Sequence, residues 1–100
     1  FNSYFKRMLL ALGKKGDAFL AITTSGNSKN ILLALEGAKQ KGIDTYAFLG
    51  GSGGEAKHLA DHSIIVPSDN VARIQESHIM LGHIVMELIE DYLLGKADAD

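Results

Sequence analysis

The sequence is organised around a short turn rich in hydroxyl side chains, residues 23–28, which read TTSGNS. An apolar run over 19–22 leads into this turn, and a helical pattern of apolar residues over 31–35 leads out of it. Backbone N–H groups at the start of a helix are unpaired, and the helix dipole favours an anion there. Hydroxyl groups add further donors, and the turn has four of them, on Thr23, Thr24, Ser25 and Ser28. The pattern therefore predicts a phosphate-binding turn.

An ordinary connection between a strand and a helix is the alternative interpretation of this turn. In that case Ser25 or Ser28 would serve only as the N-cap of the helix. One cap needs one hydroxyl group, whereas this turn carries four. The excess of hydroxyl groups favours phosphate binding, and the N-cap alternative stays open for either serine.

Hydrophobic periodicity predicts alternating helices and strands along the chain. We expect helices at about 3–14, 28–41, 55–60 and 70–94, and strands at about 17–23, 43–49 and 63–66. Strands that alternate with helices in this order form a parallel sheet, so we predict a doubly wound α/β layer fold. The first of these strands is continuously apolar, which is typical of a central strand covered on both faces.

A second turn of interest, the glycine-rich segment 50–54, follows the second predicted strand. The hydroxyl-rich turn follows the first predicted strand in the same way. Ligands of parallel α/β folds bind beyond the carboxyl ends of the strands, which meet at one edge of the sheet. We therefore expect segments 23–28 and 50–54 to lie at the same edge and to form one site.

The predicted helix at 70–94 is apolar around most of its circumference. One face of a sheet cannot cover such a helix, so we expect it to pack in a bundle with other subunits or with another part of the protein. The helix at 3–14 precedes the first strand, and the sequence does not begin with methionine. We therefore expect residues 1–100 to be a single partial domain, the C-terminal portion of a longer chain that has at least one further strand–helix unit.

Composition excludes several classes of function. The formal net charge of -2 provides no field that would attract nucleic acid or an anionic membrane. The sequence has no cysteine, which excludes disulfides and thiolate metal sites. No apolar run approaches the ~20 residues of a transmembrane helix, and the first residues carry no signal-peptide pattern. We expect neither a nucleic acid nor a membrane as a partner.

Histidines are the candidates for acid–base chemistry. His58 and His62 are four residues apart, but the short helix between them ends near residue 60, which disfavours a shared metal. His78 falls on the apolar stripe of the long helix, which is typical of a core or interface histidine. His83 falls on a polar stripe with several glutamates, where a histidine can act as general acid or base near neutral pH. A surface or interface role is the alternative for His83.

Gln75 lies near the start of the same helix, eight residues before His83. Eight residues of helix correspond to about 12 Å of rise along the axis. One metal ion would join the two residues only if both side chains were extended or if a neighbouring subunit supplied one of them.

Three stretches together resemble the phosphoheptose isomerases of the sugar isomerase (SIS) domain superfamily. They are the turn at 23–28, the pair Gly53-Gly54, and the segment 72–78 (ARIQESH) with His83 after it. The serine-rich turn alone is typical of the whole superfamily. The R-I-Q-E-x-H start of the long helix is more specific and indicates the phosphoheptose isomerase branch.

The resemblance implies a three-layer αβα sandwich with a parallel sheet, and the conversion of sedoheptulose 7-phosphate to D-glycero-D-manno-heptose 7-phosphate. This reaction begins the bacterial pathway to the heptose of lipopolysaccharide cores. The resemblance also implies a cytoplasmic homotetramer with active sites between subunits, and zinc in some members. The substrate phosphate would be held by Thr23, Thr24, Ser25 and Ser28.

The long helix would supply two further site residues by the same resemblance. Gln75 would contact substrate or metal. His83 would be the catalytic acid/base and, in zinc-bound members, a metal ligand. The catalytic glutamate and a histidine ligand of the family belong to an N-terminal half that lies outside this sequence. Two positions depart from several members, which have aspartate in place of Ala72 and threonine in place of Leu49.

Two functions without catalysis are alternatives to the isomerase. One is a SIS protein that binds a replication initiator and keeps the same helix start. The other is a module that senses a sugar phosphate. The branch that binds the initiator lacks a histidine at the position of His83, so His83 favours the enzyme.

Overall fold

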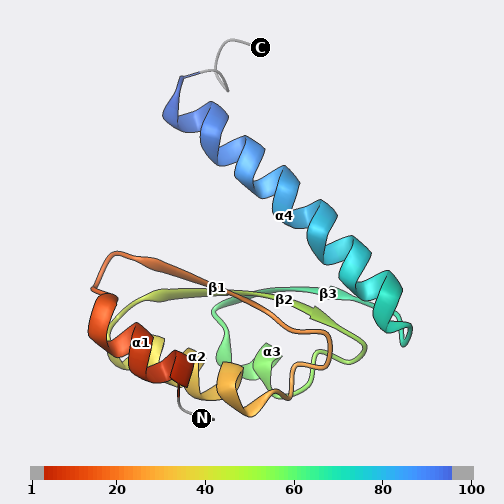
Figure 1. The fold of residues 1–100 in the computed structure, drawn as a ribbon, viewed down its shortest axis with the longest axis horizontal. Coiled ribbons are helices and arrows are strands. Elements are labelled where there is room, and N and C mark those ends of the chain that lie inside the picture. The colour runs from red at the N-terminus through yellow and green to blue at the C-terminus, as the bar shows by residue number, and fades with distance from the viewer. Residues whose placement is uncertain (1–3, 96–100) are drawn as a thin grey trace.

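The structure, a computed structural model, describes residues 4–95. Seven elements follow one another along the chain (Figure 1): α1 (Tyr4–Leu12), β1 (Ala18–Ile22), α2 (Lys29–Gln40), β2 (Asp44–Gly50), α3 (Ala56–Leu59), β3 (His62–Val66) and α4 (Val71–Leu93). Each predicted element is confirmed, with ends that differ by at most two residues. Among the described residues, no helix combines the length and the hydropathy needed to cross a bilayer.

The three strands form one parallel sheet in the order β1-β2-β3. Leu20 of β1 lies opposite Tyr46 of β2, which lies opposite His62 of β3. All three strands therefore end at the same edge of the sheet. The strands follow in sequence order, so the reversal of order that marks a doubly wound sheet does not occur within residues 4–95.

Helices lie on both sides of the sheet, as Figure 1 shows. Helices α1, α2 and α3 lie on one side, and α4 crosses the other side and extends away from it. The core between β1, β2 and the nearer helices is formed by small and branched apolar side chains: Ala21, Leu35, Ala47, Leu49 and Ala56. This arrangement confirms the three-layer α/β architecture.

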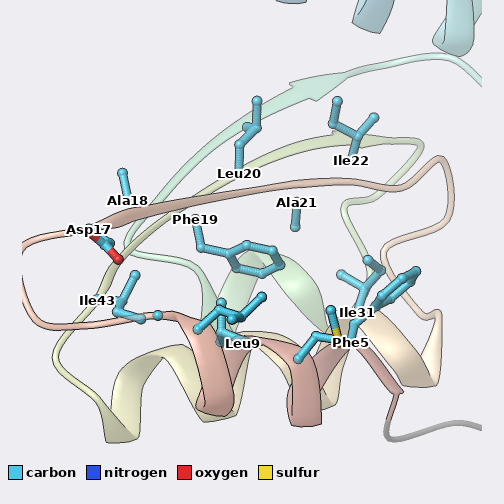
Figure 2. A pocket seen from close by; sticks show the side chains of 13 residues that line it. Phe5, Leu9, Asp17, Ala18, Phe19, Leu20, Ala21, Ile22, Ile31 and Ile43 are labelled. Carbon is cyan, nitrogen blue, oxygen red and sulfur yellow. The ribbon is translucent and has the colours of Figure 1, made fainter.

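The prediction that the first strand is central and covered on both faces is wrong for the described residues. β1 is an edge strand, because it pairs only with β2. Figure 2 shows Phe19 and Ala21 pointing toward the helices, whereas Leu20 and Ile22 point to the opposite side. Those two side chains are 41% and 51% exposed. The continuous hydrophobicity of the strand thus marks a face that no described element covers.

An apolar cavity of about 530 Å³ lies beside β1, between this strand and the helices α1 and α2 (Figure 2). Phe5 and Leu9 of α1 line it from one side and Phe19 of β1 from the other. The Lys41 ammonium holds the end of α1 by donating to the carbonyls of Leu10 and Gly13, at 2.6 Å each. The cavity is lined mainly by apolar side chains, so it does not suit a phosphate.

Helix α4 is attached to the sheet only near its start. Its buried residues are Ile74 and His78, both in its first two turns. Farther along, large apolar side chains are exposed, among them Ile79, Met80, Ile84, Met86, Leu88, Ile89, Tyr92 and Leu93. The expected packing of this helix against other subunits stays a prediction.

Asp61 connects the end of α3 to β2 through the buried side chain of Thr45. Its Oδ2 accepts hydrogen bonds from the Thr45 N–H at 2.9 Å and the Thr45 hydroxyl at 3.1 Å. The Asp61 N–H in turn donates to Thr45 Oγ1 at 2.8 Å. The backbone hydrogen bond from Thr45, followed by the one from its hydroxyl, holds the pKa of Asp61 below its ordinary value of 3.8.

We expect the Asp61 charge to make stability depend on pH in the acid range. A carboxyl whose pKa is lowered by folding stabilises the native state above its unfolded pKa, and this contribution is lost as pH falls through the folded pKa. At pH 7, Asp61→Asn should therefore melt a few degrees below the wild-type protein. The difference should shrink below about pH 4. Thermal unfolding from pH 7 to pH 2.5 measures this, with Asp44→Asn, next to Thr45 on β2, as the control. A pH-independent difference would contradict the assignment.

Candidate functional site

The hydroxyl-rich turn at 23–28 is a bent segment between the end of β1 and the start of α2. Two of its hydroxyl oxygens accept backbone hydrogen bonds that shape the bend. Thr23 Oγ1 accepts from the Gly26 N–H at 3.4 Å, and Ser25 Oγ accepts from the Asn27 N–H at 3.1 Å. An accepting hydroxyl keeps its own O–H free to donate. The turn is thus built by its own side chains, and these hydroxyls can still donate to an anion.

Ser28 occupies the N-cap position of α2, but its side chain makes no cap hydrogen bond. Its carbonyl accepts the helical bond from the Leu32 N–H at 2.9 Å. Ser28 therefore stands at the N-cap position, as the alternative interpretation expects, but its hydroxyl does not cap the helix. An exposed hydroxyl at a helix start can bind an anion together with the helix dipole.

The hydroxyl-rich turn packs directly against the glycine-rich turn at 50–54. Gly26 has φ +72°, and a Cβ atom there would lie 2.0 Å from the Gly53 carbonyl oxygen. The Gly26 carbonyl accepts from the Ala56 N–H at 2.9 Å, and Asn27 Oδ1 accepts from the Glu55 N–H at 3.0 Å. The predicted meeting of the two turns is thus confirmed. Only a residue without a side chain fits where the backbones approach this closely.

A polar pocket of about 270 Å³ lies at the carboxyl ends of the strands. Thr24 and Ser25 line it from the first turn, and Gly50, Gly51 and Ser52 from the second. The loop after β3 and the start of α4 complete it, through Ser68, Asp69, Val71 and Ile74. Thr23 and Ser28 belong to the same turn, but they are not among the residues that line this pocket. The pocket therefore contains two of the four predicted hydroxyl side chains.

Ser52 belongs to the segment 50–54 that was expected at the site, whereas sequence reasoning missed two polar side chains of this pocket, Ser68 and Asp69. A signal for these two was present, because segment 67–70 follows the third strand and so ends at the same edge of the sheet. Asp69 adds a carboxylate to the lining of the pocket. A carboxylate repels phosphate but accepts hydrogen bonds from the hydroxyl groups of a sugar.

Gln75 and His83 are both exposed on α4 and do not line this pocket. His83 lies in an open groove of about 510 Å³ along α4, together with Glu87 and Glu90. Glu87 and Glu90 belong to the predicted polar stripe of His83, but the groove is also lined by apolar residues, which are Met86, Ile89, Leu93 and Leu94. The residue before Gln75 in the chain, Ile74, lines the polar pocket, but Gln75 itself does not.

The described residues do not form a metal site by themselves. Residues 4–95 bring together no group of three or more histidine, cysteine, aspartate or glutamate side chains. His62 stacks on Tyr46 with ring centroids 5.1 Å apart. The prediction against a shared metal at His58 and His62 stays a prediction. A zinc ion on Gln75 and His83 would need ligands from outside the described residues or from another subunit.

A model of the SIS domain family matches residues 2–85 of the chain. The chain belongs to the SIS domain family. The SIS chain is 50% identical over 95 residues to a curated relative, the phosphoheptose isomerase of Sulfurimonas denitrificans. This match covers 95% of the chain and 49% of that protein. It is 55% identical over 91 residues to the phosphoheptose isomerase of Leptospira biflexa serovar Patoc, and this match covers 91% of the chain and 47% of that protein.

Solved structures give the same result for the SIS chain. A phosphoheptose isomerase from Francisella tularensis superposes with a TM-score of 0.86 at 41% identity, covering 89% of this chain and 48% of that one. The phosphoheptose isomerase from Neisseria gonorrhoeae superposes with a TM-score of 0.86 at 36% identity, and this match covers 89% of this chain and 51% of that one. These matches confirm the fold and the resemblance to phosphoheptose isomerases. The SIS chain spans about half the length of the curated relatives it matches.

Proposed function

We propose that this SIS chain is part of a phosphoheptose isomerase that converts sedoheptulose 7-phosphate to D-glycero-D-manno-heptose 7-phosphate. One observation carries the proposal. The hydroxyl-rich turn and the start of α4, which bears the R-I-Q-E-x-H segment, line one polar pocket at the carboxyl ends of the strands. Enzymes named phosphoheptose isomerase are about half identical to the chain over nearly its whole length, which supports the same reaction.

In this proposal the turn at 23–28 binds the phosphate at C7, with hydroxyl groups of Thr23, Thr24, Ser25 and Ser28 as donors. The reaction takes place at the other end of the sugar, at C1 and C2. A base removes a proton from C1 while an acid protonates the C2 carbonyl oxygen, which gives an enediol. Loss of the O1 proton and protonation of C2 then give the aldose. The remote phosphate anchor holds the reacting carbons in place for these transfers.

His83 is the acid/base group that this chain would supply, and Gln75 would orient the sugar oxygens. Histidine can exchange a proton at neutral pH, as the enediol route requires. We propose a homotetramer in which a neighbouring subunit completes the site, because His83 is exposed on a helix whose apolar side chains are also exposed. Zinc on Gln75 and His83, a cytoplasmic location and a role in lipopolysaccharide heptose synthesis remain predictions.

The variant Ser28→Ala separates phosphate binding from helix capping. Because the Ser28 hydroxyl makes no cap bond, its removal should leave the melting temperature of the intact protein unchanged. Loss of a hydrogen bond to a charged phosphate should raise KM for sedoheptulose 7-phosphate about tenfold. A coupled assay and a thermal melt measure both, with Ser63→Ala on exposed β3 as the control. A lower melting temperature with an unchanged KM would show that Ser28 is only a cap.

A further inference from the structure

His78 is the one polar side chain among the buried residues of α4, and the proposed mechanism does not use it. The residue is 3% exposed, and its ring lies against Phe48 with ring centroids 6.0 Å apart. Its Nε2 lies 2.7 Å from the carbonyl oxygen of Leu49, the next-to-last residue of β2. A carbonyl oxygen only accepts, so Nε2 carries the hydrogen and donates it.

Because of its other ring nitrogen, His78 contributes less to the stability of the fold than an apolar side chain would at this position. Nδ1 is buried and has no hydrogen-bond partner among the described residues. An unpaired buried polar atom costs free energy, which an apolar side chain at this position would avoid. The directed hydrogen bond from Nε2 therefore explains the presence of a histidine at this position better than the burial of its ring does.

That bond lies where α4 is attached to the sheet. Ile74, one turn before His78 and on the same face of the helix, is the other buried residue of α4. A Cβ atom on Gly50 would lie 2.6 Å from the Ile74 side chain, so the helix packs closely against the end of β2. Apolar contact allows a helix to rotate or slide, whereas a hydrogen bond to one carbonyl has a preferred direction.

We propose that His78 is a positioning residue. Its bond to the Leu49 carbonyl fixes the rotation of α4, and so sets where Gln75 and His83 stand relative to the phosphate turn. The inference rests on the proposed isomerase function, because these two residues matter only if α4 carries the reacting groups. A small displacement of reacting groups is enough to slow catalysis by one or two orders of magnitude.

Two matched variants of the intact protein test the bond. The side-chain amide of glutamine reaches the place of Nε2, whereas that of asparagine reaches only the place of Nδ1. His78→Asn should lower kcat about tenfold or more, with KM changed less than about threefold because the phosphate turn is untouched. His78→Gln should restore kcat to within about threefold of wild type. Ile43→Val, a change in the core on the far side of the sheet, is the control for a general loss of stability.

Equal kcat values for His78→Asn and His78→Gln would overturn the proposal. So would an equal loss of kcat in Ile43→Val, because the effect would then be one of general stability. A wild-type protein that does not turn over the sugar would overturn the proposed function instead. Hydrogen exchange over residues 71–78 then decides on His78. Faster exchange in His78→Asn than in His78→Gln supports the bond as the anchor of α4, and equal exchange overturns it.

Discussion

Replacing Gly26 with alanine is expected to cost the intact protein about 3 kcal/mol or more of unfolding free energy and to abolish phosphosugar binding. Gly26 has φ +72°, which alone costs a residue with a side chain about 1 kcal/mol. The new Cβ would also lie 2.0 Å from the Gly53 carbonyl oxygen and 2.6 Å from the Gly53 carbonyl carbon. Both atoms are backbone, so the two turns must move apart, and the pocket between them opens.

The matched control for this change is Gly16→Ala. Gly16 has φ +96°, but nothing lies within 4 Å of the position of its Cβ. Gly16→Ala therefore has the same kind of backbone strain without the collision, and it should lower the free energy of unfolding by only about 1 kcal/mol. Urea unfolding gives both free energies, and the rise in melting temperature on adding sedoheptulose 7-phosphate reports binding. Equal losses for the two variants would contradict the close packing of the turns.

Replacing His83 with alanine is expected to lower kcat of the intact protein by about 10²- to 10⁴-fold. The histidine transfers protons in the proposed reaction, while the phosphate turn at the other end of the substrate is unaffected. KM for sedoheptulose 7-phosphate should therefore change by less than about tenfold. Steady-state kinetics of the isomerisation measure both constants.

His58→Ala provides the control for the His83 experiment, because His58 is also an exposed helical histidine but lies in α3. It should keep the kcat of the wild type. A His83→Ala protein with full kcat would remove His83 from the mechanism. An inactive protein with an altered oligomeric state by light scattering would instead assign His83 to subunit packing, which is the alternative left open by the sequence.

Local patterns in the sequence were sufficient for the elements and for the edge of the sheet that holds the site. The apolar run before residues 23–28, the glycines at 50–54 and the apolar stripe through His78 each depend on nearby residues alone. Period and turn chemistry decide such features. The three-layer architecture then follows, because strands that alternate with helices form a parallel sheet with helices packed on it.

Contacts between distant segments could not be derived in the same way. The hydrophobicity of β1 did not show that its second face is open, since a strand at the edge of the described sheet can be as apolar as a central one. The approach of Gly26 to Gly53 and the bond from His78 to the Leu49 carbonyl join residues far apart in sequence. The residue types do not show which backbone carbonyl a side chain binds, so the sequence indicated only that His78 is a core or interface residue.

Proton NMR of the intact protein with sedoheptulose 7-phosphate in D₂O shows directly whether the protein isomerises this sugar. If the protein is the isomerase, an anomeric signal of the aldose product grows with time. Deuterium then appears at C2 of that product whenever the enediol exchanges its proton with solvent. A spectrum that stays that of the ketose, while the sugar phosphate raises the melting temperature of the protein, would contradict the account. The turn at 23–28 would then belong to a protein that binds a phosphosugar without converting it.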